Sequence, residues 1–165
     1  MSRASPAPRT AGTFGAEEWR LLIRLPAEVM IATVISRDDG PRRTIAEGLA
    51  GLDAIAAGRG SDSELVRSVV AAIYREPADG RPDERSPAAA TEDFRDVLDH
   101  CRRAATVLRG GAAPADASAY CQWVRLIAAR VCDASRPSGV PSNDDGQAGA
   151  VDEELLDELT AALSS

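Results

Sequence analysis

Two carboxylates in strongly apolar surroundings are the residues of this chain best suited to acid–base chemistry. Glu28 and Asp53 each lie within a run of aliphatic residues. Burial of a carboxylate disfavours its ionised form and is costly unless the group is paired. These two residues are therefore the candidate catalytic residues. The same pattern fits carboxylates that reach solvent or bind an arginine, and the sequence leaves both interpretations open.

The chain has one histidine, His100, at the edge of an apolar helical stripe. A histidine that acts as a general base needs a nearby carboxylate and a group from which it takes a proton. Asp96 lies about one helical turn away and Cys101 is adjacent, but adjacent residues on a helix point in different directions. His100 is therefore predicted to be a boundary residue. A single histidine also excludes a metal site built from several histidines.

The three cysteines, Cys101, Cys121 and Cys132, form no CxxC pair. An odd number of cysteines cannot close a disulfide framework. If one helix carries Cys121 and Cys132, the turns between them span ~16 Å, which is too far for a disulfide or a shared metal ion. We expect reduced thiols that are buried as small apolar groups, in a cytoplasmic protein.

Two glycines interrupt a segment in which apolar residues recur at helical spacing. Gly48 and Gly51 lie inside this segment, and each interior glycine costs a helix about 1 kcal/mol relative to alanine. One explanation is the close approach of another helix, and the other is a ligand that lies against bare backbone. Gly48 and Gly51, together with Tyr120 and Trp123, are the candidate ligand-binding residues.

Composition excludes several classes of function. The formal net charge is −7, which argues against nucleic acid and anionic membranes as partners, since both require clustered positive charge. Every cation is arginine, because the chain has no lysine. Schiff-base chemistry, pyridoxal phosphate attachment and a Walker lysine are thereby excluded. We expect no cofactor and no metal.

The remaining composition indicates a small bacterial protein without a membrane anchor. No run approaches the ~20 apolar residues that a transmembrane helix needs, and residues 1–13 lack the apolar core of a signal peptide. Arginine as the sole cation, with abundant alanine and glycine, is typical of a GC-rich bacterial genome. Aromatic residues make up only 4% of the chain, so the core is predicted to be aliphatic.

The elements that must position these residues are all predicted to be helical, since no strand pattern occurs. We expect an all-α fold, a compact array of about seven helices in one domain over residues 14–165. Residues 1–13 are predicted to be a disordered tail, and 77–90 and 135–150 to be flexible loops. The predicted helices are 16–25, 26–37, 41–57, a fourth from Ser61 to before Pro77, a fifth from Thr91 to 109, a sixth starting near Asp116 and a short last one capped by Asp152.

Proline and apolar periodicity set the expected arrangement. Pro26 disfavours helix in the residue before it, so the first helix is predicted to end at Leu25. The segment 26–37 is apolar on nearly every side, which predicts a buried central helix. The fifth and sixth helices are expected to form a hairpin against it. In the third helix, Ile45, Leu49 and Leu52 form the apolar stripe.

Four patches of the sequence carry a resemblance to known proteins. They are Phe14 with Glu17–Trp19, Leu21–Leu22 and Leu25–Pro26; Glu47–Ile55; Tyr120–Val124 with Ile127, Ala128 and Val131; and Val151–Glu154 with Leu159 and Leu163. Together they resemble an uncharacterised bacterial all-helical family, which implies a helical fold and carries no established activity. Asp39–Gly40 and 151–159 show a fainter likeness to tellurite-resistance TerB-like helical domains, and no residue role is carried over from it.

The absence of a recognisable catalytic constellation in the sequence favours a binding or interaction protein. Its expected partner is another protein or a second copy of the chain, as in a homodimer. The alternative is an enzyme or accessory protein of bacterial specialised metabolism that acts on a small apolar ligand. In that case Glu28 or Asp53 would supply acid–base chemistry between helices. An exposed apolar stripe over a closed core would favour the interaction protein.

Overall fold

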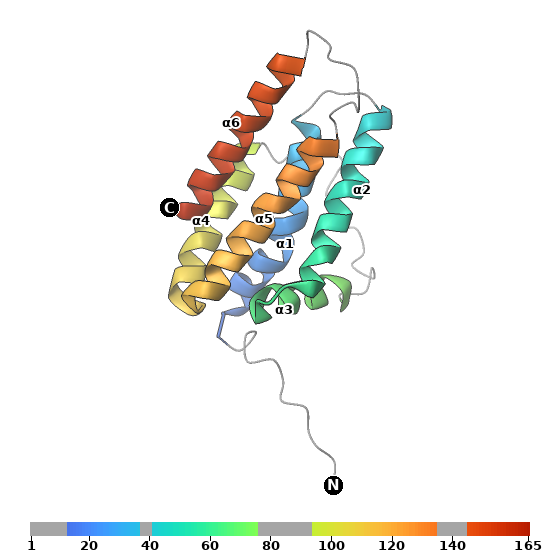
Figure 1. Cartoon of the computed structure of the whole chain (residues 1–165). Coiled ribbons are helices and arrows are strands. Elements are labelled where there is room, and N and C mark those ends of the chain that lie inside the picture. The colour runs from blue at the N-terminus through green and yellow to red at the C-terminus, as the bar shows by residue number, and fades with distance from the viewer. Residues whose placement is uncertain (1–12, 37–40, 76–93, 135–144) are drawn as a thin grey trace, which may run out of the picture.

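The computed structural model describes residues 13–36, 41–75, 94–134 and 145–165. Over these ranges the chain forms six α-helices and no strand, so the all-α prediction is confirmed (Figure 1). A single 3₁₀ turn, η1 (Gly58–Gly60), follows the second helix. The helices are α1 (Ala16–Ile35), α2 (Pro41–Ala57), α3 (Glu64–Arg75), α4 (Phe94–Gly111), α5 (Pro114–Ala134) and α6 (Asp145–Ser164).

The predicted count of seven helices is wrong, because the first two predicted helices are one. Helix α1 runs through Pro26, which is buried. Proline has no N–H to donate to the carbonyl four residues earlier, which here is that of Leu22. The hydroxyl of Tyr120 in α5 donates to this Leu22 carbonyl at 2.8 Å. A contact from a distant helix thus satisfies the carbonyl that proline leaves without its helical donor, and the helix continues.

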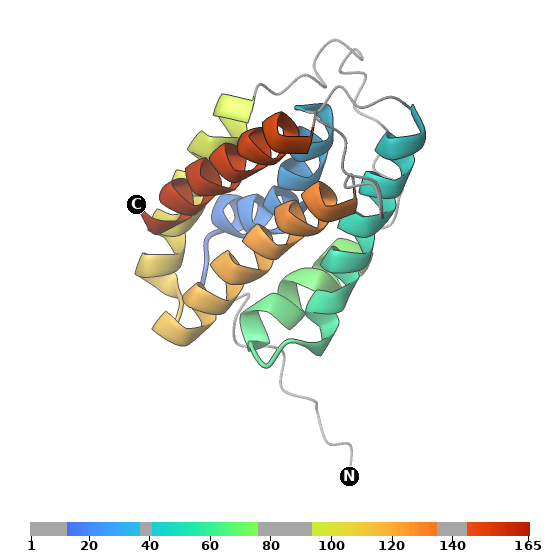
Figure 2. The same cartoon turned by 45° about the horizontal axis from the view of Figure 1, so that its top comes forward.

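Helices α1 and α5 share the centre of the bundle. Each of them contacts α2, α3 and α4, and α5 also contacts α6. Helix α2 lies along one edge of the bundle and α6 along the opposite side, as Figures 1 and 2 both show. The predicted hairpin exists as α4 and α5, and both of its helices pack on α1. The single central helix expected over 26–37 is therefore half of a two-helix centre.

The core is aliphatic, as the composition predicts. Helix α3 contributes Leu65, Val66, Val69 and Val70, all fully buried. Helix α5 contributes its central aliphatic residues together with Tyr120 and Trp123, whose rings meet edge to face at 5.9 Å between centroids. No described helix is long and apolar enough to cross a membrane.

Three helices start at residues other than those predicted. Helix α3 begins at Glu64 rather than Ser61, because the Oγ of Ser63 accepts from Val66 N–H at 3.3 Å and so acts as the cap. The same hydroxyl donates to Asp116 at 2.6 Å, which ties α3 to the first turn of α5; α5 itself starts at Pro114, slightly before the predicted position. Helix α6 begins at Asp145, so part of the predicted loop 135–150 is helical, and Asp152 is a buried residue inside that helix rather than its cap.

Other predictions fall outside the described residues. They are the tail over 1–12, the predicted cap at Thr91, the loop 77–90 and residues 135–144 of the second loop.

Candidate functional site

The outer face of α2 carries the two most exposed large aliphatic side chains among the described residues. Ile45 and Leu49 are 65% and 63% exposed, and Leu52 on the same helix is 50% exposed. With Gly48 they occupy positions i, i+3, i+4 and i+7, which share one face of a helix. We call these four residues the outer stripe. The predicted apolar stripe of this helix therefore exists, but it faces solvent instead of the core.

The inner face of α2 is built mainly from small residues. It buries Gly51, Ala54 and Ile55 against the bundle, and it also buries Glu47 completely. Because Glu47 follows Ile45 by two residues, it lies on the side of the helix away from the outer stripe. Because the aliphatic stripe was the only face predicted for this helix, the burial of Glu47 was not predicted. The second series at helical spacing, Glu47, Gly51, Ala54, Ile55 and Gly58, is the sequence signal that would have revealed it.

The two helix glycines have different surroundings. A Cβ at Gly51 would overlap Met30 Cγ and lie 3.1 Å from Val131 Cγ2, so close packing against α1 and α5 favours glycine there. A Cβ at Gly48 would meet no atom of the described residues within 4 Å. Close helix approach within the chain therefore explains Gly51 and does not explain Gly48. The helix carries the ~1 kcal/mol cost of Gly48, and no packing contact among the described residues requires glycine there.

The two candidate catalytic carboxylates have different environments. Asp53 is exposed on α2. The side chain of Glu28 is only 12% exposed, and its two oxygens lie 2.7 Å from Arg24 Nη2 and 2.9 Å from His100 Nδ1. In this geometry the imidazole N–H donates to the carboxylate. No sequence pattern indicated the Glu28–His100 contact, because 72 positions separate the two residues.

The Glu28 contact joins α1 to α4 beside two thiols. Burial raises the pKa of Cys101 to about 12, and the nearby Cys121 and Glu28 add to the effect. Burial likewise raises the pKa of Cys121, although Arg125 opposes it. All three cysteines are free, as predicted. A thiol with a raised pKa stays protonated at neutral pH and is a poor nucleophile.

The aromatic ligand-binding candidates hold the fold together. Tyr120 is fully buried and satisfies the Leu22 carbonyl, and burial raises the pKa of its phenol well above the ordinary value. Trp123 donates from Nε1 to the Ala54 carbonyl at 3.1 Å, near the end of α2. Its indole also packs on Gly58, where a Cβ would lie 2.8 Å from the ring. Both polar groups are therefore used internally.

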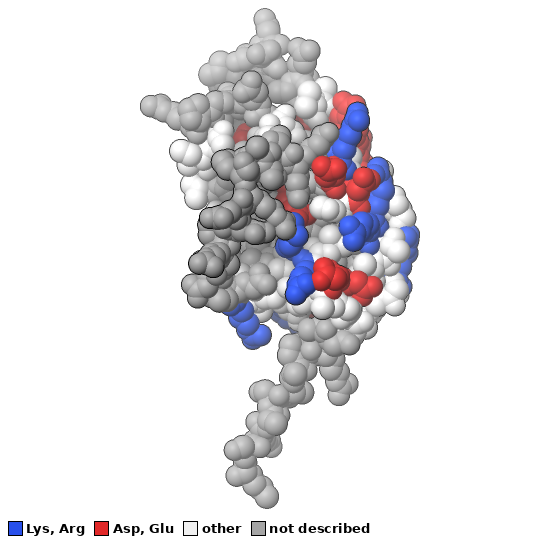
Figure 3. All heavy atoms as spheres, turned by 180° about the vertical axis from the view of Figure 1, so that it is seen from behind, with Lys and Arg blue, Asp and Glu red and all other residues white. Residues whose placement is uncertain are grey.

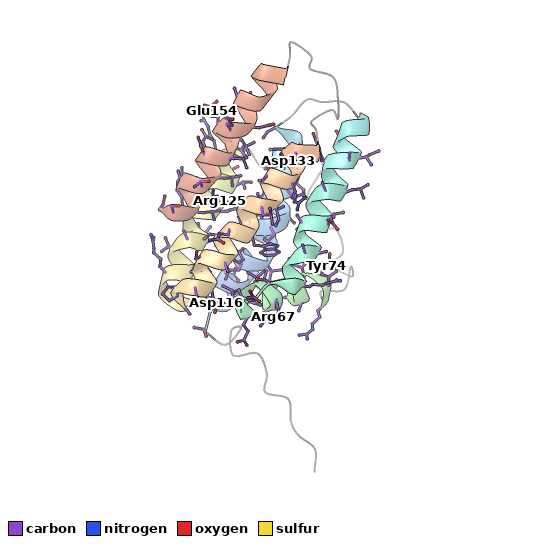
Figure 4. All side chains as sticks on the ribbon, viewed as in Figure 1. Arg67, Tyr74, Asp116, Arg125, Asp133 and Glu154 are labelled. Carbon is purple, nitrogen blue, oxygen red and sulfur yellow. The ribbon has the colours of Figure 1, made fainter. Side chains whose placement is uncertain are left out.

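A groove of about 330 Å³ lies between α4, α5 and the end of α6, and no residue of α2 lines it. Arg109, Arg125 and Gln122 contribute polar groups to it, and Leu108 and Leu163 contribute apolar surface. Figure 4 shows Arg125 on α5, with Glu154 on the neighbouring α6. None of the residues singled out in the sequence as candidate acid–base or ligand-binding residues lines this groove.

The other long helices expose charged side chains over much of their surface, although α1 also exposes Ile31 and Ile35 near its end. Exposed acidic residues follow one another on α6, and α1 and α4 expose both acidic and basic residues. Figure 3 shows such a mixture of charges from behind the molecule. On α2, from Thr44 to Leu52, no exposed residue is charged. No group of three or more potential metal ligands occurs in the described part of the chain.

Comparison of the chain with protein-family models, curated proteins and solved structures finds no match. The resemblance to a bacterial all-helical family is therefore still an expectation. The function is inferred from the arrangement of the described residues alone.

Proposed function

We propose that the protein is a small helical interaction protein and that the outer stripe of α2 is its contact surface for another protein chain. The observation that carries the proposal is the exposure of Ile45, Leu49 and Leu52 on one face of α2, which Asp53 borders. Three large aliphatic residues on one face are costly to hold in water, and a contiguous apolar surface of this kind is typical of protein contacts.

The geometry supports the alternative, an acid–base enzyme, less well. Glu28 is held by Arg24 and His100, and Asp53 is exposed on α2. The groove between α4, α5 and α6 is lined by neither carboxylate. Glu28 forms an ion pair with Arg24 within α1 and a hydrogen bond with His100 of α4, an arrangement that suits the packing of two helices.

Site-specific photo-crosslinking tests the proposal. A photoreactive amino acid at position 49 should form covalent adducts with a protein chain, either in a purified sample or in cells that express the protein. Arg103, exposed on α4 among charged residues, is the matched control position and should give few adducts. Adding Ile45→Asp and Leu52→Asp to the same chain should abolish the adducts at position 49.

Equal adduct yields at positions 49 and 103, in both settings, would contradict the proposal. Circular dichroism of each variant checks that the helices are intact. Because all substituted positions are exposed, the fold should tolerate them.

A further inference from the structure

The outer stripe contains both a protruding side chain and a gap. Leu49 projects from the helix with 63% of its surface exposed. Gly48, at the other edge of the stripe, offers bare backbone, and a Cβ there would meet no atom of the described residues within 4 Å. A surface that carries a knob and a matching hole is complementary to itself under a two-fold rotation.

We infer that the outer stripe binds the outer stripe of a second copy of this chain, with the two α2 helices antiparallel and each Leu49 seated over Gly48 of the other copy. This inference rests on the proposed function and names its partner. In this register Ile45 of one protomer packs against Leu52 of the other. Gly48 then has the role inside the pair that it lacks inside the protomer, because bare backbone allows the two helices to approach closely.

The charge distribution permits a second copy to bind through this face. Each protomer has a formal net charge of −7, so two copies repel wherever like-charged faces meet. The outer faces of α1, α4 and α6 carry exposed charged residues, whereas the outer stripe carries none. A symmetric contact through α2 therefore places no like charges directly against each other at its centre. Antiparallel pairing also sets the helix dipoles in their favourable relative orientation.

The size of the surface sets the expected strength. With 17 residues, α2 is about 25 Å long. One helix pair of this length buries less than the ~800 Å² per partner that standard interfaces bury. The dimer is therefore expected to be concentration-dependent, with a dissociation constant of roughly 1–100 µM.

Sedimentation equilibrium of the full chain over a range of concentrations tests the inference. The wild-type chain should dimerise, and Leu49→Asp and Gly48→Gln should each raise the dissociation constant at least about tenfold. Gly48→Gln is the more discriminating variant, because its Cβ meets none of the described residues within 4 Å and glutamine favours helix over glycine. The melting temperature of its dilute monomer should therefore be unchanged or higher. Gly110→Gln in α4 is the matched control, because a Cβ there also meets nothing within 4 Å, and it should dimerise as the wild type does.

Cysteine crosslinking tests the orientation. A mixture of Ile45→Cys and Leu52→Cys chains should form a disulfide between the two variants, whereas Ile45→Cys alone should not crosslink to itself. The reverse pattern would overturn the antiparallel arrangement.

A wild-type chain that stays monomeric up to roughly 1 mM, far above the expected dissociation constant, would overturn self-association. So would a Gly48→Gln chain that dimerises as tightly as the wild type. Failure of the proposed function is separable from these results. If photo-crosslinking at position 49 captures a different protein while the purified chain is monomeric, the stripe is a contact surface but its partner is not a second copy.

Discussion

Helices α2 and α3 are consecutive and carry comparable sets of aliphatic residues, but they place them in opposite directions. In α3 the residues Leu65, Val66 and Val69 are fully buried, while the charged Arg67 is exposed. In α2 the largest aliphatic residues are mostly exposed, while Glu47 is fully buried. The two helices therefore differ in role, since α3 closes the core of the protomer and α2 presents apolar surface outward.

This difference shows that apolar periodicity locates the apolar face of a helix. It does not say whether the same chain or another chain covers that face. For α3 the cover is the bundle itself. For α2 the cover is the proposed partner.

The strongest test of this contrast exchanges one aliphatic residue in each helix for aspartate. Val69→Asp buries an unpaired charge in the core and should lower the free energy of unfolding by more than about 4 kcal/mol, or prevent folding. Leu49→Asp, measured in dilute solution, should lower it by about 1 kcal/mol or less, because the side chain is exposed. Urea denaturation followed by circular dichroism measures both. Losses of similar size would mean that the face of α2 belongs to the core.

The loss of stability at alkaline pH should depend on buried groups of the interior and not on the outer stripe. The folded-state pKa of Cys101 is about 12, against an ordinary 9.0, so the folded chain holds this proton more tightly than the unfolded chain. The stability linked to the protonated thiol is fully present below pH 9.0 and is lost as the pH rises through about 12. The loss should reach up to about 4 kcal/mol, and the phenol of Tyr120 should add to it in the same direction.

Denaturation at a series of pH values measures this loss. Cys101→Ala should flatten part of the dependence, whereas Leu49→Asp should leave it unchanged, because α2 holds neither of these groups. An unchanged slope in Cys101→Ala would show that other groups control alkaline unfolding.

The smallest effect concerns the glycine on the inner face of α2. Gly51→Ala should lower the free energy of unfolding by about 1–3 kcal/mol, because the added methyl meets Met30 and Val131 at close range. The same substitution at Gly48 should raise it in the dilute monomer by up to about 1 kcal/mol. Thermal unfolding of both variants at low concentration checks the signs. Equal signs would remove the distinction between the two faces of α2.

Much of the secondary structure was predictable because it depends on neighbours in sequence. Helix α2 has the predicted bounds, from Pro41 to Ala57, and the start of α1 at Ala16 is also as predicted. The error at Pro26 arose because the rule that proline ends a helix is local, whereas the donor that satisfies Leu22 comes from 98 positions away. The start of α3 was misplaced at Ser61, because Ser63 two residues later is also a good capping residue and its hydroxyl caps the helix.

The candidate site was predictable only in its parts. Sequence patterns singled out Glu28, His100, Gly48 and Gly51 as residues of interest. They did not pair Glu28 with His100, nor did they distinguish Gly48 from Gly51. Both facts depend on which helices lie next to one another.

The helical character of the protein, its acidity and its lack of lysine chemistry could all be read from the chain, because composition and helical period are properties of the sequence. The side of each helix that meets the core emerged only when the helices were packed together. Helix α2 has two faces poor in charge, and burial of its small-residue face lets α1 and α5 approach closely at Gly51. The larger aliphatic side chains of the outer stripe are consequently left facing outward, and this choice of face is the basis of the proposed function.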